Sequence, residues 1–280
     1  MKRAIVVYLD YTNILLQQFA CFYTSYKYSH CDENTDLVVF GPKISLDLVP
    51  EDCIKVELNP FEGIWKTYPY MNSVNCLGTK EAEFLKGYDY LLRSDIDTFL
   101  TPAWNSFFPD HYTVGGGGYT NTTEVVENIK RVAEKFNTKH QGIHNIGSTH
   151  YGPSSQVIEV CKLSQEVAYY LLAEEFKDDP GAWPSWYKGV TILYSTEIAT
   201  NHLIDVVDIK PDQLDFHSTS TDSIHIHPHI HCWHTNDVFS KFAYFNGKYD
   251  HLVPNLHCDE VRQYCLNMAL LAKKELPRLY

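Results

Sequence analysis

The sequence predicts an α/β protein with a mixed sheet and flanking helices, folded as a single compact domain. In the first hundred residues, short apolar runs alternate with stretches of helical periodicity, which is the order expected for βαβ units. With 280 residues and 44% hydrophobic content, the chain has enough apolar material for one large core. Ligands of such sheets bind near the carboxyl ends of strands, so polar residues that follow a buried strand are the first site candidates.

Four apolar runs in the first half predict strands at residues 4–9, 36–40, 53–58 and 88–92. The first run is continuously apolar, as a buried parallel strand should be. Thr12 or Asn13 is expected to cap the helix that follows, because either side chain can accept a hydrogen bond from a backbone N–H at a helix start. Residues 71–86 are also expected to be helical.

The second half is less regular but keeps the same mixture of elements. Its apolar patterns predict helices at residues 124–136, 156–176 and 196–203, and strands at residues 111–114, 206–209 and 224–233. Residues 178–187, rich in Pro, Gly and Trp, are expected to form a loop. Asp259 is expected to cap a last helix that ends before Pro277.

The most informative segment is YDYLLRSDIDTFL, in which Asp95 and Asp97 follow a buried strand. Residues two apart in an extended chain point to the same side, so the two carboxylates are expected to lie together. Such carboxylates repel each other unless a cation lies between them, and Mg²⁺ or Mn²⁺ is the usual partner. These ions keep positions open for phosphate oxygens, which favours a nucleotide-diphosphate site. A solvated turn after a strand is the alternative.

A second group of ligand types lies in the segment IHIHPHIHCWH, which holds five histidines. If this segment is one strand, its first four histidines share a face. Neutral imidazole suits Mn²⁺ and Zn²⁺, so one or two of these residues are expected to bind metal and the rest to be structural. His231 is the first choice because it is nearest the turn at residues 232–233, and His229 and His234 come next.

Composition narrows the classes of function. The formal net charge of −12 argues against a nucleic-acid partner or an anionic membrane surface. No run of 18 apolar residues is present, and the apolar run at the N-terminus is too short for a signal peptide, so no membrane insertion is expected. Eight scattered cysteines without a C-x-x-C pair favour reduced thiols and therefore a cytoplasmic protein.

A buried strand followed by RSDIDTFL, with a histidine segment late in the chain, resembles a GT-A glycosyltransferase with its Rossmann-like sheet. The segments YLDYTN, LLRSDIDTFLTPAW, NIGSTHYG and HCWHTNDVFSKF are similar to small soluble glycosyltransferases of chlorella viruses and related plant and algal proteins. Within the viral group, the chain resembles a xylosyltransferase that builds a capsid glycan. The resemblance covers almost the whole chain in the order of its elements, and its specific part is Asp95, Asp97 and the histidine segment.

The resemblance implies a metal-dependent transfer of a sugar, with xylose as the best guess, from a UDP-sugar to an oligosaccharide or glycoprotein glycan. It implies that Asp95, Asp97 and His231 hold Mn²⁺ or Mg²⁺ on the donor diphosphate. Residues 1–114 would form the nucleotide-sugar-binding half of a single GT-A domain. Residues 115–280 would form the acceptor half, with the late metal-binding strand and the C-terminal helix.

The resemblance also assigns the contacts with the donor. Tyr8, Leu9 and Asp10, at the end of the first strand, would lie against the uracil and ribose. The remaining contacts would come from Arg93, which reaches a phosphate or the sugar, from Gly147 and Ser148 in a loop at residues 145–151, and from Lys241, which neutralises the leaving phosphate. A plain turn at residues 145–151 and an exposed structural lysine at position 241 are the alternatives.

An inverting transferase needs a base that deprotonates the acceptor hydroxyl. Glu197, in YSTEIATNH, follows the Trp-rich loop and is expected to open a helix, which matches the place where inverting GT-A enzymes carry this base. A plain glutamate in a first helical turn is the alternative, and Asp178 and Asp179 are weaker candidates. A retaining enzyme needs no such base, so the stereochemical outcome stays open.

Two other classes of function use the same residue types. A metal-dependent phosphohydrolase or nucleotidyltransferase also combines aspartates and histidines, but two-metal sites usually need more acidic ligands than this strand offers. A non-catalytic carbohydrate- or metal-binding protein would use the aromatic residues and the histidines alone. Turnover of a UDP-sugar with Mn²⁺ separates the transferase from both.

Overall fold

The computed structural model describes residues 1–232 and 238–280, so His234 lies outside the described residues. The strands are β1 (Arg3–Tyr8), β2 (Thr35–Gly41), β3 (Ile54–Glu57), β4 (Tyr90–Arg93), β5 (Thr98–Leu100), β6 (Tyr112–Gly116), β7 (Ile146–Pro153), β8 (Val207–Ile209), β9 (Phe216–His217) and β10 (His229–His231). The α-helices are α1 (Asn13–Tyr28), α2 (Lys43–Leu46), α3 (Asn72–Asn75), α4 (Thr123–Lys135), α5 (Ser154–Tyr170), α6 (Thr191–Leu203), α7 (Lys241–Phe245) and α8 (Val261–Glu275).

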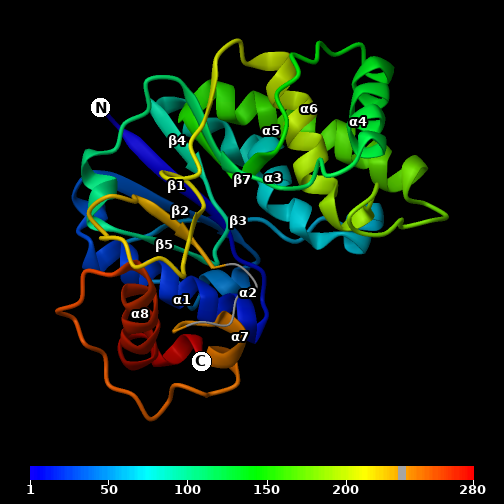
Figure 1. Cartoon of the computed structure of the whole chain (residues 1–280). Helices are drawn as coiled ribbons and strands as arrows, with labels where there is room; N and C mark the ends of the chain where they lie inside the picture. The colour runs from blue at the N-terminus through cyan, green and yellow to red at the C-terminus, as the bar shows by residue number, and fades with distance from the viewer. Residues whose placement is uncertain (233–237) are drawn as a thin grey trace. The chain divides into compact units, whose positions relative to one another are not determined.

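Seven strands form one mixed sheet in the order β3-β2-β1-β4-β7-β6-β8 (Figure 1). Strand β2 is parallel to β3 and β6 is parallel to β8, whereas β7 is antiparallel to both of its neighbours. A second sheet has the order β5-β10-β9, with β10 antiparallel to β5 and parallel to β9. Helices pack on the strands, for example α5 on β4 and β7. The predicted α/β class with a mixed sheet and flanking helices is confirmed.

Contacts along the chain divide it into two units. The first unit comprises Met1–Ala4, Leu58–Arg93 and Pro109–Lys210. The second unit comprises Ile5–Glu57, Ser94–Phe108 and Pro211–Tyr280. The predicted single domain, with a donor half and an acceptor half divided near residue 114, stays a prediction.

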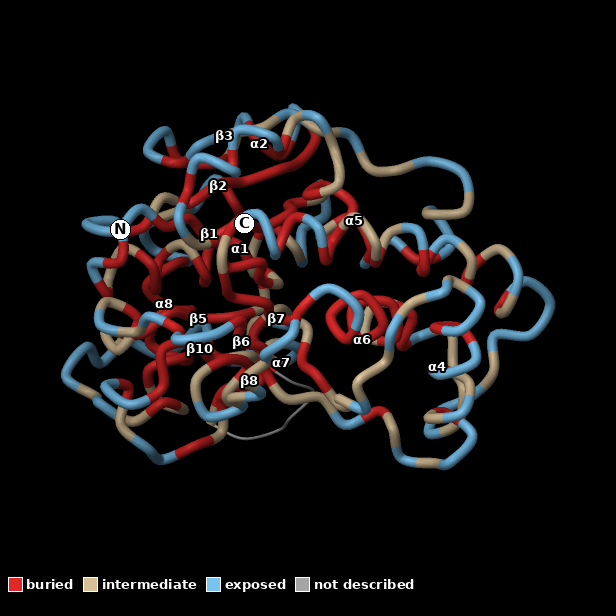
Figure 2. The backbone as a smooth tube through the Cα atoms, turned by 90° about the horizontal axis from the view of Figure 1, so that it is seen from above, coloured by how far each residue is buried: buried red, intermediate tan, exposed pale blue. Residues whose placement is uncertain are grey.

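The second unit is built on α1 and on β1 from Ile5 onward. Strand β1 is buried along its whole length, as its continuous apolar run predicts (Figure 2). Thr12 accepts a hydrogen bond from the Leu15 N–H and caps α1, which confirms one of the two predicted caps. Helix α8 packs against α1 (Figure 1), and its Tyr264 hydroxyl donates to the Leu100 carbonyl at the end of β5. These contacts hold in place the strand that follows Asp95 and Asp97.

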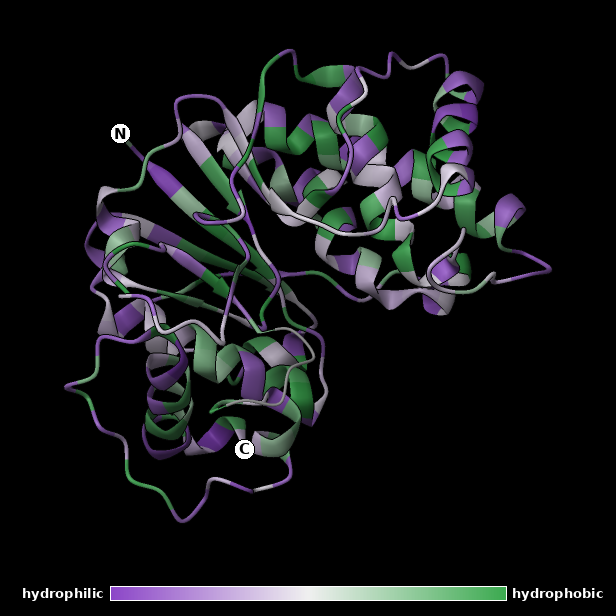
Figure 3. Cartoon of the chain, viewed as in Figure 1, coloured by the Kyte–Doolittle hydropathy of each residue, from purple (hydrophilic) through white to green (hydrophobic). Residues whose placement is uncertain are grey.

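The first unit packs α4, α5 and α6 around a shared apolar core. Helix α4 is amphipathic, with Val125, Ile129 and Val132 buried, and Figure 3 shows its hydrophilic and hydrophobic bands side by side. The helix predicted at residues 124–136 is therefore confirmed. Its apolar side chains recur at three- and four-residue spacing, which places them on one face.

Several predicted element boundaries are wrong. Residues 71–86 contain only the short helix α3 and 3₁₀ turns, because the backbone becomes extended at Thr79. Helix α6 begins near residue 191 rather than 196, since the buried Tyr194 and Ile198 start its apolar face a turn earlier. Helix α8 begins after Glu260, which is its N-cap residue but makes no side-chain capping bond, so Asp259 is not the cap.

The histidine segment is a strand only at β10. Residues 224–226 form a turn, which breaks the two-residue alternation that the sequence prediction assumed. The prediction that four histidines share one strand face is therefore wrong, and only His229 and His231 lie on β10. His227 is instead held by Asp222, whose carboxylate lies 3.0 Å from its Nε2 atom.

Gly41, at the end of β2, lies against the backbone of Leu9. A Cβ atom at this position would lie 2.3 Å from the Leu9 carbonyl oxygen, which cannot move aside as a flexible side chain could. We expect Gly41→Ala to lower the free energy of unfolding by about 1–3 kcal/mol, the usual cost of overpacking, as measured by urea denaturation. Gly87→Ala is the control because its Cβ would have no atom within 4 Å. Equal losses in the two variants would contradict the steric argument.

Candidate metal centre

Asp95 and Asp97 lie in the turn between β4 and β5. The Ser94 and Thr98 hydroxyls each donate to the Asp95 carbonyl at 2.8 Å. The Cys232 N–H, directly after β10, donates to the Asp97 carbonyl at 3.0 Å. The turn is therefore held both by its own side chains and by the late strand.

The structure brings Asp95, Asp97 and His231 together within the second unit. Each offers one ligand atom, and these atoms all lie within 4.8 Å of one another. The Nε2 atom of His231 lies 3.4 Å from Oδ1 of Asp97, and all three residues are partly exposed. Two carboxylates and one imidazole are a donor set that suits Mn²⁺ and, with more oxygen ligands, Mg²⁺. The residues fit the predicted metal, and metal binding itself stays a prediction.

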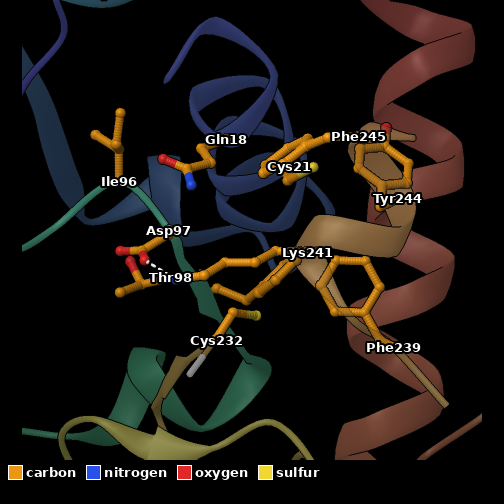
Figure 4. Close-up of a pocket in the computed structure, with 11 residues that line it drawn as sticks. Gln18, Cys21, Ile96, Asp97, Thr98, Cys232, Phe239, Lys241, Tyr244 and Phe245 are labelled. Atoms are coloured by element: carbon orange, nitrogen blue, oxygen red, sulfur yellow. Dashed lines mark hydrogen bonds and ion pairs between the residues drawn. The ribbon is translucent and has the colours of Figure 1, made fainter. Parts of the chain in front are cut away.

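Lys241 binds the second oxygen of the Asp97 carboxylate. Its Nζ atom lies 2.6 Å from Asp97 Oδ2 (Figure 4). Burial acts to raise the pKa of Asp97, but His231 and Lys241 outweigh it and hold that pKa well below its usual range. Asp97 is therefore ionised, which is the form that binds a cation.

The ammonium of Lys241 and a divalent ion compete for the Asp97 carboxylate. We expect Lys241→Met to bind Mn²⁺ about fivefold more tightly in the absence of nucleotide, since removal of such a paired cation is worth about 1 kcal/mol. An electron paramagnetic resonance titration of free Mn²⁺ measures this. Lys43→Met is the control, because Lys43 forms an exposed pair with Asp47 at 2.8 Å. Unchanged or weaker Mn²⁺ binding by Lys241→Met would refute the competition.

The two histidines of β10 differ in charge. Burial lowers the pKa of His229 to about 4, so this ring is neutral at pH 7. Burial also opposes protonation of His231, but the Asp97 and Asp215 carboxylates outweigh it and raise the pKa of His231 well above its ordinary value. In the metal-free protein, His231 and Lys241 thus supply the positive charge that a dication would otherwise supply.

A narrow pocket opens beside Asp97 (Figure 4). Its walls are mostly apolar or aromatic side chains from α1, from β5 and from the segment around α7, and they include Cys21, Phe239 and Tyr244. Among the described residues that line it, Asp97 and Lys241 are the charged ones. Among the candidate ligands, Asp97 therefore lies beside an apolar wall.

Tyr8 ends β1, and Leu9 and Asp10 follow it, where the sequence predicts contacts with uracil and ribose. Leu9 is fully buried and donates its N–H to the Phe40 carbonyl at 2.7 Å, and Tyr8 is 7% exposed. Asp10 is partly exposed, and its carboxylate accepts the Tyr11 N–H at 2.8 Å. Asp10 is the most accessible of the three, and their nucleotide contacts stay predictions.

Arg93, Gly147 and Ser148 lie in the first unit. Residues 146–153 form strand β7, so the expectation of a loop at residues 145–151 is wrong; the segment is held by pairing with β4 and β6. The guanidinium of the buried Arg93 donates to the Ser148 carbonyl at 2.5 Å and to the Ser73 carbonyl at 3.4 Å. Arg93 is thus engaged with backbone, and its phosphate or sugar contact stays a prediction, as do those of Gly147 and Ser148.

Glu197 lies in the middle of α6 and is fully buried, so the prediction that it opens a helix is wrong. Its Oε2 accepts the Tyr119 hydroxyl at 2.5 Å and the Asn145 N–H at 3.0 Å. Its Oε1 lies 2.7 Å from Nδ1 of His144. Burial acts to raise the pKa of Glu197, but the nearby His140 ring and hydrogen bonds from His144 and Tyr119 outweigh it and lower that pKa. The catalytic role of this ionised carboxylate stays a prediction.

His140, His144 and Glu197 are also close enough to suggest a metal site. The Nε2 atom of His140 lies 3.6 Å from Oε1 of Glu197, but its Nδ1 accepts the Gly142 N–H at 3.1 Å. A neutral histidine that accepts at Nδ1 carries its proton on Nε2, so Nε2 has no lone pair for a metal. The hydrogen bonds of this cluster therefore favour a structural role, in which its polar side chains hold the loop at residues 138–145 in place.

Asp215 and Ser94 are site residues that the sequence patterns did not reveal. Oδ1 of Asp215 lies 3.3 Å from Nδ1 of His231, and Oγ of Ser94 lies 2.9 Å from Nε2 of His229. The position of Ser94 directly before the D-x-D pair was an available signal. Nothing in the sequence points to Asp215, because its contact depends on the pairing of the very short strands β9 and β10.

Residues 1–276 match the sequence model of a family described as a domain of unknown function, DUF7164. The chain belongs to the DUF7164 family. The matched range includes Asp95, Asp97 and His231, so the whole candidate centre lies inside the DUF7164 domain. A comparison with curated proteins finds no match.

Among solved structures, this DUF7164 chain is similar to the galactosyltransferase LgtC, determined in complex with donor and acceptor sugar analogs. The two share 15% sequence identity with a TM-score of 0.45, over 77% of this chain and 76% of LgtC. Galactosyl transfer is a property of LgtC. Within the described residues, no helix has both the length and the apolarity needed to cross a bilayer.

Proposed function

We propose that this DUF7164 protein is a metal-dependent GT-A glycosyltransferase that moves a sugar from a UDP-sugar to a glycan acceptor. The supporting observation is that the ligand atoms of Asp95, Asp97 and His231 lie within 4.8 Å of one another, directly after a buried strand. Ions that suit these donors also take diphosphate oxygens as ligands. The resemblance of the sequence adds the substrates: xylose is the first donor sugar to test, and an oligosaccharide or glycoprotein glycan is the acceptor.

The residues of the centre have different roles in the proposed transfer. Asp97 and His231 would hold Mn²⁺ or Mg²⁺, with Asp95 as a further ligand or a partner of the ribose. When bound, the metal supplies Lewis-acid stabilisation of the leaving diphosphate. Lys241 already lies 2.6 Å from Asp97, and its ammonium would bind a phosphate oxygen and neutralise charge that develops on the leaving group.

Glu197 is the proposed base of an inverting transfer. Because it is fully buried, a proton from the acceptor hydroxyl would reach it through His144, whose Nδ1 lies 2.7 Å from the carboxylate. A retaining transfer needs neither group. The anomeric configuration of the product, read by nuclear magnetic resonance, decides between the two routes.

A thermal-shift screen of UDP-, GDP- and CMP-linked sugars, with and without Mn²⁺, tests the donor class. We expect UDP-xylose with Mn²⁺ to raise the Tm, because a ligand at a hundred times its Kd stabilises the folded state by about 2.7 kcal/mol. The donor that shifts the Tm is then assayed for sugar transfer to a glycan acceptor. No shift with any nucleotide would contradict the proposal and favour a carbohydrate- or metal-binding protein, whereas hydrolysis of the diphosphate would favour a phosphohydrolase.

A further inference from the structure

His229 and His231 lie on the same strand, two residues apart, and both rings approach Asp215. Nδ1 of His229 lies 3.7 Å from Oδ1 of Asp215, and Nδ1 of His231 lies 3.3 Å from the same oxygen. Their Nε2 atoms reach different groups: that of His229 lies 2.9 Å from the Ser94 hydroxyl, and that of His231 lies 3.4 Å from Asp97 Oδ1. Sequence alone offers both histidines as metal ligands, and their contacts with Asp215 distinguish them.

His229 is held as a hydrogen-bond donor. The backbone N–H of Asp215 donates to Nδ1 of His229 at 3.2 Å, so this nitrogen carries a lone pair and the ring proton lies on Nε2. That proton is donated to the Ser94 hydroxyl, which in turn donates to the Asp95 carbonyl. With its proton on Nε2, His229 has no lone pair to offer a metal there, and it braces the turn that carries the two aspartates.

His231 meets the carboxylate of Asp215 instead of its N–H. An ionised carboxylate accepts hydrogen bonds, so it favours a proton on Nδ1 of His231. With an ion bound, the lone pair is then left on Nε2, the atom that faces Asp97. A carboxylate behind a ligand histidine fixes the ring and increases the basicity of the coordinating nitrogen.

The backbone conformation of Asp215 makes these two contacts compatible. Asp215 has a φ of 59°, in the left-handed region, and is 3% exposed. It stands directly before β9, which pairs in parallel with β10 so that Phe216 lies opposite Ile230 and His217 opposite His231. One residue therefore presents its N–H to the first histidine of β10 and its carboxylate to the second.

We propose that Asp215 selects the metal ligand of the histidine segment, by placing the proton of His229 on Nε2 and that of His231 on Nδ1. Asp215 is a positioning residue and does not touch the ion. The inference rests on the proposed function, because it concerns the metal of that transfer. It accounts for the binding role of His231 and assigns His229 to the support of the D-x-D turn.

Asp215→Asn tests the proposal, since asparagine tolerates the left-handed conformation and keeps the backbone N–H that binds His229. We expect its affinity for Mn²⁺ in the presence of UDP to fall ten- to a hundredfold, the usual effect of losing such a support, in electron paramagnetic resonance titrations. Asp222→Asn is the matched control, because it alters another carboxylate–histidine pair, with His227 at 3.0 Å, and should bind Mn²⁺ as the wild type does. Wild-type affinity in Asp215→Asn would overturn the inference alone; absence of Mn²⁺ binding by the wild type would overturn the proposed metal site as well.

A second measurement does not depend on any variant. In the wild-type protein loaded with Mg²⁺ and UDP and labelled with ¹⁵N-histidine, long-range ¹H–¹⁵N spectra identify the protonated nitrogen of each ring. We expect the Nε2–H form for His229 and the Nδ1–H form for His231. A proton on Nδ1 of His229, or on Nε2 of His231, would overturn the proposal. Asp215→Asn should leave the His229 signal unchanged, which a general loss of structure would not.

Discussion

Asp97→Asn should lower metal-dependent sugar transfer by about a hundred- to a thousandfold, since a metal ion contributes several kcal/mol of charge stabilisation to a leaving group. Asp97 contacts both His231 and Lys241 of the candidate centre. One of its oxygens lies 3.4 Å from Nε2 of His231 and the other 2.6 Å from Nζ of Lys241. Asparagine has nearly the same shape but no charge, so it removes the ligand and leaves both cations without their shared partner.

Two measurements separate a lost ligand from a damaged fold. Mn²⁺ binding, followed by electron paramagnetic resonance, should weaken together with the rate, while urea denaturation reports stability. Asp47→Asn is the matched control, because Asp47 forms an exposed pair with Lys43 at 2.8 Å. Full transfer activity of Asp97→Asn in Mn²⁺ would show that the metal–diphosphate mechanism is wrong.

Glu197→Gln should lower the free energy of unfolding by roughly 3 kcal/mol, the scale expected when buried hydrogen bonds to an ionised group are disrupted. The carboxylate is fully buried and receives hydrogen bonds from Tyr119, Asn145 and His144. The amide of glutamine has one acceptor oxygen and one donor nitrogen, so it leaves at least one of these donors without an acceptor. Glu166→Gln, at an exposed position of α5, is the control and should be neutral.

The loss should depend on pH. The pKa of Glu197 is lowered in the folded protein from its ordinary value of 4.5, so its ionised form contributes stability above the unfolded-state pKa. As the pH falls below about 4.5, the unfolded chain takes up the proton first and this contribution is lost. The difference in stability between wild type and Glu197→Gln should therefore be largest near neutral pH and shrink in acid. A difference that stays constant down to pH 3 would contradict an ionised, buried Glu197.

Kinetics of the same variant address the proposed base. If Glu197 receives the acceptor proton through His144, Glu197→Gln should lower kcat at a temperature where the variant is fully folded, with little change in Mn²⁺ or UDP binding. An unchanged transfer rate would leave Glu197 with a structural role only. Stability and rate together distinguish the two roles.

Several elements were predictable from local sequence. The buried strand β1, the Thr12 cap of α1 and the apolar face of α4 follow from runs and spacings that act within a few residues. The D-x-D pair could be placed after a strand for the same reason. Failures occurred where local pattern and tertiary contact disagree: residues 224–226 alternate like a strand but turn, and Glu197 lies in the second turn of its helix rather than its first.

The sequence by itself determined the α/β class and the types of ligand residue that are present, namely paired carboxylates after a strand and a histidine segment late in the chain. Only the tertiary structure decided that His231 is the histidine that contacts Asp97, and that Lys241 contacts the same carboxylate. It also decided that Asp215 contacts the other nitrogen of the His231 ring. The physical reason is that side-chain type and alternation are local properties, whereas the ligand atoms of a site come from strands joined by pairing over more than 130 residues, between His231 and Thr98. The register of that pairing is set by the packing of the whole unit.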